Sequence, residues 1–333
     1  MISVICPIYN EEKYIVRCLE SILRQDYPMD DIEVLLVDGM SSDETRSKIK
    51  PYCDKYKFIH VLDNTHRTVP YAMNIGIKAA KGDVIIRLDA HAIYPENYFS
   101  KLVRYLNELN ADNVGAVCKT LPAKDSPKCK AIAAALSSAF GMGNSYFRIG
   151  AAQIMQVDTV PFGCYRRNVF DKIGLYDNEL IRNQDDELNA RLKKHGGKIY
   201  LIPDLVVDYY ARDTIKKTGK MFYQYGLYKP LVNKKVGSPA TVRQFFPVAF
   251  VLGIVLGFVA GLLNRYLLVA YIFVLVLYFA LALMFSLKSS FFIKQVFFQI
   301  ITYFVVHVNY GYGYLVGLYK VFTHKSLTAK VNR

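Results

Sequence analysis

Two long apolar runs near the carboxyl end limit what this chain can fold into. Residues 245–263 read FFPVAFVLGIVLGFVAGLL and residues 266–287 read YLLVAYIFVLVLYFALALMFSL. A helix needs about 20 apolar residues to cross a bilayer, so each run is about long enough. A third run, FFIKQVFFQIITYFVV at 291–306, is shorter. With 53% hydrophobic residues and a mean hydropathy of +0.15, the sequence predicts a membrane domain over residues 244–322 with two or three spans.

Charge is distributed unevenly along the chain. The last acidic residue is Asp213, whereas ten of the 42 lysines and arginines lie in residues 231–333. Anionic lipid attracts such cations by about 1 kcal/mol each near its surface, so we expect membrane lipid, and not nucleic acid, as the partner. Residues 214–243, basic and aromatic, are expected to form an amphipathic interfacial segment, with a solvated linker as the alternative. Residues 323–333 form a basic tail.

The amino-terminal sequence indicates the side of the membrane on which the front domain lies. MISVICPIYN has no cationic region before a long apolar core and no cleavage site, so it is not a signal peptide. We therefore expect a multi-pass protein of the cell inner membrane with residues 1–213 in the cytoplasm. Three crossings would put the basic tail outside, against the positive-inside rule, and an even number suits its charges better.

The first 110 residues alternate between strand-like and helix-like segments. Apolar runs typical of strands alternate with segments of helical length, in the order 2–9, 11–25, 32–39, 41–56, 58–63, 69–80 and 83–90. Strands separated by helices imply right-handed crossovers and a mostly parallel sheet. The sequence therefore predicts an α/β fold.

Polar residues follow the carboxyl ends of these predicted strands, where open α/β sheets bind ligands. Each is weak evidence alone, because an Asp after a strand is commonly a turn or cap residue. Their shared position at one rim of the sheet is the stronger signal. The set comprises Pro7, Tyr9, Glu11, Asp38, Asn74 at a helix start, Asp89 and His91.

Four stretches together resemble the family 2 glycosyltransferases of the GT-A fold, which move a sugar from a nucleotide-sugar donor. They are VICPIYNEEKYIVRCLESILRQDYP, EVLLVDGMSSDET, AMNIGIKAAKGDVIIRLDAHA and QDDELNARLKKHG. The LDAHA variant and the apolar carboxyl end are similar to membrane-anchored exopolysaccharide enzymes of the succinoglycan type. The resemblance implies a GT-A catalytic domain, Rossmann-like with a mostly parallel sheet, over residues 1–213, followed by C-terminal transmembrane helices.

The resemblance also implies how the donor is held. Pro7, Tyr9 and Glu11 would line the nucleotide pocket together with Asn74, and Asp38 would hydrogen-bond the base, most often uracil in this family. A carboxylate can accept a hydrogen bond from an imide N–H, which gives base selectivity. The alternative for Asp38 is capping the helix predicted at 41–49, which the serines that follow it can also do.

Asp89 matches the first acid of the family's DxD motif, which meets the ribose and the divalent metal on the diphosphate. His91 stands where the second acid would be. A neutral imidazole binds Mn²⁺ or Mg²⁺, and because Mg²⁺ prefers oxygen we expect the change to favour Mn²⁺. The alternative is that His91 only packs or hydrogen-bonds, with Asp89, phosphates and water holding the metal.

A base must also lie within reach of the acceptor hydroxyl. The family's base aligns with Asp185 in NQDDEL, where Gln184 replaces the preceding Glu. The alternative is that Asp185, Asp186 and Glu187 only favour a helix amino terminus. On the acceptor side, the VPFGCYRR stretch resembles the family's acceptor loop through Phe162, Gly163 and Arg166, although a tight turn at the glycine explains it nearly as well.

These residues lead to one expected activity and two alternatives. We expect an inverting, metal-dependent hexosyltransferase that adds a sugar to a membrane-held acceptor, such as a polyprenyl-diphosphate-linked saccharide, in polysaccharide or glycan assembly. One alternative is a processive polysaccharide synthase, but such enzymes use a QxxRW motif and this chain has no Trp. The other is an inactive membrane-anchored nucleotide-binding scaffold, supported by Gln184 and His91.

Overall fold

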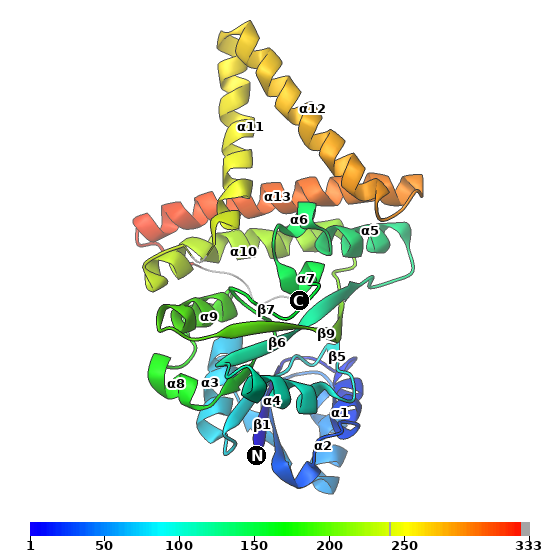
Figure 1. Ribbon diagram of the computed structural model, residues 1–333, viewed down its shortest axis with the longest axis vertical. Coiled ribbons are helices and arrows are strands. Elements are labelled where there is room, and N and C mark those ends of the chain that lie inside the picture. The colour runs from blue at the N-terminus through cyan, green and yellow to red at the C-terminus, as the bar shows by residue number, and fades with distance from the viewer. Residues whose placement is uncertain (240, 328–333) are drawn as a thin grey trace. The chain divides into compact units, whose positions relative to one another are not determined.

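The computed structural model describes residues 1–239 and 241–327, and the chain divides into two compact units (Figure 1). Among the described residues, the first unit consists of Met1–Lys119 and Gly150–Tyr209, and the second of Thr120–Ile149 and the chain from Tyr210 to Leu327. Residues 120–149, expected in the front domain, therefore cluster with the carboxyl-terminal helices. The expected basic tail lies outside the described residues from position 328.

A mixed sheet forms the centre of the first unit. Its strand order is β3-β2-β1-β4-β8-β6-β9-β5, with β7 paired to β9. The strands are β1 Ile2–Ile8, β2 Ile32–Asp38, β3 Ile59–Asp63, β4 Val84–Arg87, β5 Ala92–Ile93, β6 Asn113–Leu121, β7 Met155–Gln156, β8 Cys164–Arg166 and β9 Ile199–Tyr210.

The first four strands are parallel and are joined by helices, as predicted. β1 and β2 are mostly apolar, and every residue of β2 is buried, which is typical of a parallel strand covered on both faces. The helices of this unit are α1 Ile15–Leu23, α2 Thr45–Lys55, α3 Val69–Ala79, α4 Tyr98–Glu108, α8 Asn168–Ile173 and α9 Gln184–Lys194, with a 3₁₀ turn η1 at Met29–Asp31. The predicted α/β class is confirmed.

Strands β1 and β4 separate at their carboxyl ends, and Pro7 marks the place. β1 pairs with β4 only from Ile2 to Ile5, and the Ile5 carbonyl accepts from Leu88 N–H at 2.9 Å. Pro7, two residues later, faces the same side, where β4 has already ended at Arg87. Because no ladder bond is required there, a residue without an N–H is tolerated in a central strand.

The second unit consists of helices. The long α10, Ile215–Val236, packs on α13, Ile293–Phe322, and α13 also contacts α5 and α11. The other helices are α5 Pro127–Leu136, α6 Ala139–Met142, α7 Tyr146–Ile149, α11 Phe246–Leu263 and α12 Arg265–Leu287, with a 3₁₀ turn η2 at Val242–Phe245. Figure 1 shows α11 and α12 as a hairpin whose open end lies against α13.

Glycines set how closely α10 and α13 approach each other. A Cβ on Gly226 would lie 2.1 Å from the Tyr310 carbonyl oxygen, and one on Gly313 would lie 2.2 Å from that of Tyr223. A Cβ on Gly317 would lie 2.2 Å from the Leu227 carbonyl oxygen. The glycines of HVNYGYGYLVG at 307–317 therefore serve helix packing.

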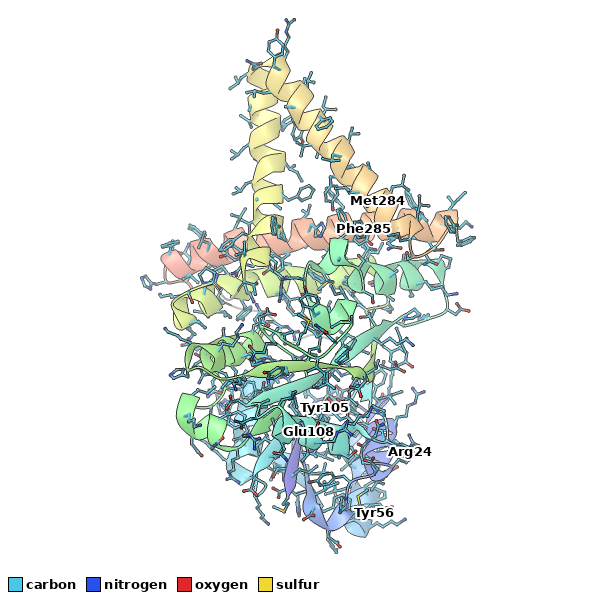
Figure 2. The ribbon with its side chains drawn as sticks, in the orientation of Figure 1. Arg24, Tyr56, Tyr105, Glu108, Met284 and Phe285 are labelled. Atoms are coloured by element: carbon cyan, nitrogen blue, oxygen red, sulfur yellow. The ribbon has the colours of Figure 1, made fainter. Side chains whose placement is uncertain are left out.

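Two helical segments of the described chain are long and apolar enough to cross a membrane. They are Val242–Leu263 and Arg265–Leu287, with mean hydropathies of 2.5 and 2.8. Figure 2 shows their side chains projecting away from the hairpin, and Leu263, for example, is 84% exposed. The third apolar run lies within α13, which buries polar residues such as Gln299 and Thr302 and is not a candidate span by the same criteria.

Candidate active site

The candidate site lies at the carboxyl ends of β2, β1 and β4 in the first unit. The strand order reverses between β1 and β4, because β1 continues through β2 to β3 whereas β4 lies on its other side. Such a switch point is where open α/β sheets hold ligands. Asp38 and Asp89 follow strands on either side of β1, so strand spacing puts them about 10 Å apart.

Asp38 ends β2 and is fully buried. Its carboxylate accepts from the Ser41 N–H at 3.2 Å and from the Ser41 hydroxyl at 2.5 Å, and it forms an ion pair with Arg46 of α2. These are the local bonds of a turn residue, and Asp38 does not cap a helix, because α2 begins at Thr45 with Glu44 as its N-cap. The structure thus places Asp38 at the rim, and contact with a nucleotide base stays a prediction.

The residues after β1 hold the neighbouring part of the rim. Glu11 is buried, its N–H donates to the Thr45 hydroxyl at 2.7 Å, and its carbonyl accepts the first N–H groups of α1. The Tyr9 ring lies against Gly39, where a Cβ would be 3.2 Å from Tyr9 Cδ2. With Pro7, these residues form the β1 part of the rim, and that they line a nucleotide pocket stays a prediction.

Asp89 and His91 lie in a tight turn directly after β4. The Asp89 N–H donates to the Tyr94 hydroxyl at 2.8 Å, and the Asp89 carbonyl accepts the Ala92 N–H at 3.3 Å. His91 Nε2 lies 3.9 Å from Asp89 Oδ2, and the ring packs against Tyr209 with centroids 5.6 Å apart. The turn therefore brings the two predicted metal ligands face to face.

Arg87, the last residue of β4, joins the parts of the site that are distant in sequence. Its guanidinium bonds to Asp185 Oδ1, and its Nη2 lies 3.6 Å from Asp89 Oδ1. The side chain is only 6% exposed, and its backbone N–H donates to the Gly163 carbonyl at 3.0 Å. One buried cation thus brings Asp89, from the β4 turn, and Asp185, from α9, to the same place.

The ionisation of this group follows from burial and pairing. Burial raises the pKa of Asp185 above its ordinary value, and the Arg87 charge and hydrogen bond oppose that rise. Burial also lowers the pKa of Arg87, but Asp185 and Asp89 together raise it well above its ordinary value. Asp185 is therefore a carboxylate of increased basicity that Arg87 helps to keep ionised.

At the start of α9, Asp185 and Glu187 lie in different environments. Asn183, in the left-handed conformation with φ 59°, precedes the helix. Glu187 is buried and bonds twice to Arg191, each at 2.8 Å. Arg191 also donates to the carbonyls of the α8–α9 connection. Glu187 therefore ties that connection to α9, whereas Asp185 contacts Arg87.

Two of the predicted site residues, Asn74 and Arg166, do not contact Arg87, Asp89 or Asp185. Asn74 is bonded to Tyr176 N–H at 2.9 Å and to the Tyr176 carbonyl at 2.8 Å, so it fixes the segment before α9. Arg166 donates to the carbonyls of Ala111 and Leu106, and it pairs with Val84 at the amino end of β4. Arg166 thus lies at the end of β4 opposite to Asp89.

Phe162 and Gly163 lie on the site's side of β8. Phe162 has φ 51°, and a Cβ on Gly163 would come within 2.6 Å of both the Asn113 Oδ1 and the Tyr165 ring. Since the Gly163 carbonyl bonds the Arg87 N–H, this turn positions Arg87. Arg87 was missed from the sequence. The sequence feature that could have identified it is an arginine at the end of the buried run VIIR. A buried arginine needs acidic partners, so such a position indicates nearby carboxylates.

The donor set has a limited capacity for a metal. Among the described residues, no group of three or more His, Cys, Asp or Glu could hold an ion. Asp89 and His91 offer one oxygen and one nitrogen that face each other. Divalent ions that act on phosphates commonly take one or two protein ligands and complete their coordination with phosphate oxygens and water. The residues present therefore fit a divalent ion that shares its ligands with a diphosphate.

Known proteins match this chain in sequence and in fold. The chain matches the model of Glycosyl transferase family 2 over residues 3–174. It is 34% identical over 271 residues to the dolichyl N-acetyl-alpha-D-glucosaminyl phosphate 3-beta-D-2,3-diacetamido-2,3-dideoxy-beta-D-glucuronosyltransferase of Methanococcus voltae, across 79% of this chain and 82% of that protein. It is 29% identical to the succinoglycan biosynthesis protein ExoA of Rhizobium meliloti, across 74% of each chain.

Solved structures share the fold at low sequence identity. The mannosyltransferase PcManGT from Pyrobaculum calidifontis, in complex with GDP-Man and Mn²⁺, superposes with a TM-score of 0.62 at 17% identity, over 93% of this chain and 86% of that one. S. aureus TarS 1-349 with UDP-GlcNAc gives 0.52 at 16% identity, over 97% and 92%. These likenesses confirm the GT-A fold. The chain belongs to glycosyl transferase family 2 and is a glycosyltransferase.

Proposed function

We propose that the enzyme transfers a sugar, with inversion, from a uridine-diphosphate sugar to a lipid-linked saccharide at the cytoplasmic face of the inner membrane. The observation that carries the proposal is the convergence of Asp185 and Asp89 on one buried guanidinium, that of Arg87. It puts a carboxylate of raised pKa beside the acid that the family uses for the diphosphate. A base and a leaving-group site are then neighbours.

The donor is held by the rim of the sheet. Asp38 accepts from the uracil imide, which requires its bonds to Ser41 to rearrange. Asp89 and His91 would hold a divalent ion, and such an ion would supply charge neutralisation for the departing diphosphate. The mannosyltransferase of like fold was solved with Mn²⁺, which supports this assignment.

The transfer is a single displacement. The acceptor hydroxyl loses its proton to Asp185 as its oxygen forms a bond to the anomeric carbon on the face opposite the phosphate. The bond from the anomeric carbon to the phosphate oxygen breaks, and its electron pair leaves with the nucleoside diphosphate. One displacement inverts the anomeric configuration, and no residue becomes glycosylated.

Arg87 helps to hold Asp185 ionised although that side chain is partly buried. Its Nε is buried and has no hydrogen-bond partner within the described part of the chain. An unpaired buried donor costs about 1–3 kcal/mol, so an arriving substrate oxygen would be stabilised there.

The acceptor class is supported by the relatives and by the second unit. The M. voltae relative is named for a dolichyl phosphate-linked sugar, and the R. meliloti relative for succinoglycan biosynthesis. The apolar side chains of α11 and α12 are largely exposed, which would be costly in water and is favourable in lipid. We therefore assign these helices to anchoring the enzyme where such acceptors reside.

The test compares Asp185→Asn with Asp186→Asn in the full chain. A panel of nucleotide sugars and a lipid extract would first identify the product by mass, and its anomeric configuration by NMR. We expect D185N to bind donor normally while transfer falls by about 10²- to 10⁴-fold, the usual range for a lost general base. D186N should stay near the wild-type rate. Retained configuration, or equal losses in both variants, would refute the proposal.

A further inference from the structure

A cavity of about 640 Å³, open to the surface, lies in the second unit, and none of the residues assigned to sugar transfer line it. One wall is the start of α5 and the segment before it, with Lys124 and Lys128. The other is the start of α13, with Lys294, Phe297 and Phe298. The two helices contact each other, so both walls belong to one helix pair. Its volume is typical of small-ligand sites.

The cavity carries an excess of positive charge. Three lysines line it, and Asp213 is the one acid among the residues that line it. That carboxylate is bonded to Lys217 Nζ at 2.8 Å, a bond that holds the Asp213 pKa below its ordinary value. Lys124 also contributes to that lowering, whereas Lys128 and Lys294 do not, and the three lysines still outnumber the one acid.

The amino terminus of α5 adds donors to the same wall. Ser126 caps the helix, and its hydroxyl accepts from the Cys129 N–H at 3.3 Å. Pro127 follows without an N–H, and the Lys128 N–H in the first turn has no acceptor inside the helix. The partial positive charge of a helix amino terminus favours an anion. Here it acts together with three lysines.

The α13 wall is apolar and continues onto an exposed apolar surface. Phe297 is 58% exposed, and Lys128 Nζ lies 5.5 Å from the Phe298 ring centroid. Just before them in the sequence, Phe291 and Ile293 are 86% and 82% exposed. A free inorganic anion would gain nothing from this surface. A ligand with a charged head and a hydrocarbon chain matches both parts.

The position of the cavity along the chain agrees with such a ligand. The candidate span α12 ends at Leu287, and Lys288 follows with its Nζ 4.9 Å from the Phe285 ring centroid. Figure 2 labels Met284 and Phe285 at the end of α12 that approaches α13. A lysine just past an apolar helix marks the headgroup level. Lys294 lies six residues further on, at the start of α13.

We propose that this cavity binds the phosphate of an anionic lipid, with Lys124, Lys128 and Lys294 around the phosphate and the lipid chain along Phe297. Such a site, distinct from sugar transfer, fixes the enzyme to a lipid by its headgroup. The phosphate can come from a phospholipid or from a prenyl phosphate, and the two share the chemistry that the cavity recognises.

The test measures binding to the purified full-length protein in a neutral detergent by titration calorimetry. The probes are dihexanoyl phosphatidylglycerol, farnesyl phosphate, inorganic phosphate and dihexanoyl phosphatidylcholine. One variant carries K124Q, K128Q and K294Q. The matched control carries K216Q, K220Q and K234Q, three exposed lysines of α10 in the same unit that do not line the cavity.

We expect one or both anionic lipids to bind more tightly than inorganic phosphate and phosphatidylcholine. The preference between them identifies the source of the phosphate. The cavity variant should lose roughly fivefold per lysine, on the order of a hundredfold in all, while the control stays within a few-fold of wild type.

Three outcomes would overturn the proposal. The first is an equal loss of affinity in the cavity variant and the control. The second is inorganic phosphate binding as tightly as the lipids. The third is that farnesyl phosphate does not bind and that phosphatidylglycerol binds no more tightly than phosphatidylcholine. If the triple variant fails to fold, the single variants K128Q and K294Q each test the same claim, and an unchanged affinity in both would refute it.

Discussion

Replacing Arg87 by Met tests how the site keeps its base ionised. The substitution removes the guanidinium that bonds Asp185 and lies 3.6 Å from Asp89, while it keeps an unbranched side chain in the strand. Burial already raises the Asp185 pKa, and Arg87 opposes that rise. Without Arg87 the pKa rises further. Transfer requires the ionised carboxylate, so the acidic limb of the rate profile should move to higher pH.

The size of the shift follows from the geometry. An opposite charge in direct contact typically lowers a carboxyl pKa by about 1–3 units, so losing it should move the limb upward by about that amount. Each unit corresponds to about 1.4 kcal/mol. The R87M rate should therefore be most reduced at acidic pH and should approach the wild-type rate as the pH increases.

The assay is kcat against pH for wild type, R87M and R87K. Lys keeps the charge but not the planar fork, so R87K should move the limb less than R87M. Removing one partner of a buried pair also costs about 3–5 kcal/mol of stability, so the variants are measured well below their unfolding temperatures. Arg191→Met is the control, because it breaks the ion pair with Glu187 and leaves the Arg87–Asp185 pair intact. A folded R87M enzyme with an unmoved acidic limb would refute the reasoning.

Two further predictions follow from the helix contact and from the metal ligands. Gly226→Ala puts a Cβ 2.1 Å from the Tyr310 carbonyl oxygen and should lower the free energy of unfolding by about 1–3 kcal/mol, measured by thermal unfolding. Gly253→Ala, whose Cβ would meet nothing within 4 Å, is the control and should be neutral or stabilising. Equal melting temperatures for the two variants would contradict the packing account. His91→Asp should raise the Mg²⁺-supported rate relative to the Mn²⁺-supported rate, while His60→Asp on β3 should leave that ratio unchanged; a constant ratio in H91D would remove His91 from the metal site.

The parallel half of the sheet was predictable because its signals are local. Strands β1 to β4 are short, mostly apolar runs separated by segments of helical length, and each crossover follows from its neighbours in sequence. β8 was not predictable, since it is three residues long and pairs antiparallel between β4 and β6. The grouping of residues 120–149 with the carboxyl-terminal helices depends on contacts across more than a hundred residues, which no local pattern encodes.

The candidate site likewise contains residues that the sequence could predict and residues that it could not. Asp89 and Asp185 could be named from the resemblance, and the structure brings both to Arg87. Asp185 and Glu187 look alike in NQDDEL, and only their different partners, Arg87 and Arg191, distinguish a carboxylate at the site from one that holds a loop. Asn74 was predicted to line the nucleotide pocket, but its amide is bonded to the backbone of Tyr176.

The central claim is that Asp38, Asp89 and Asp185 surround one nucleotide sugar. The most direct measurement is a structure of the D185N enzyme with a uridine-diphosphate sugar and Mn²⁺. The account predicts the uracil against Asp38, the diphosphate against Asp89, and the anomeric carbon open to the side chain at position 185. A donor bound elsewhere, or one with its phosphates shielding the anomeric carbon from position 185, would contradict it.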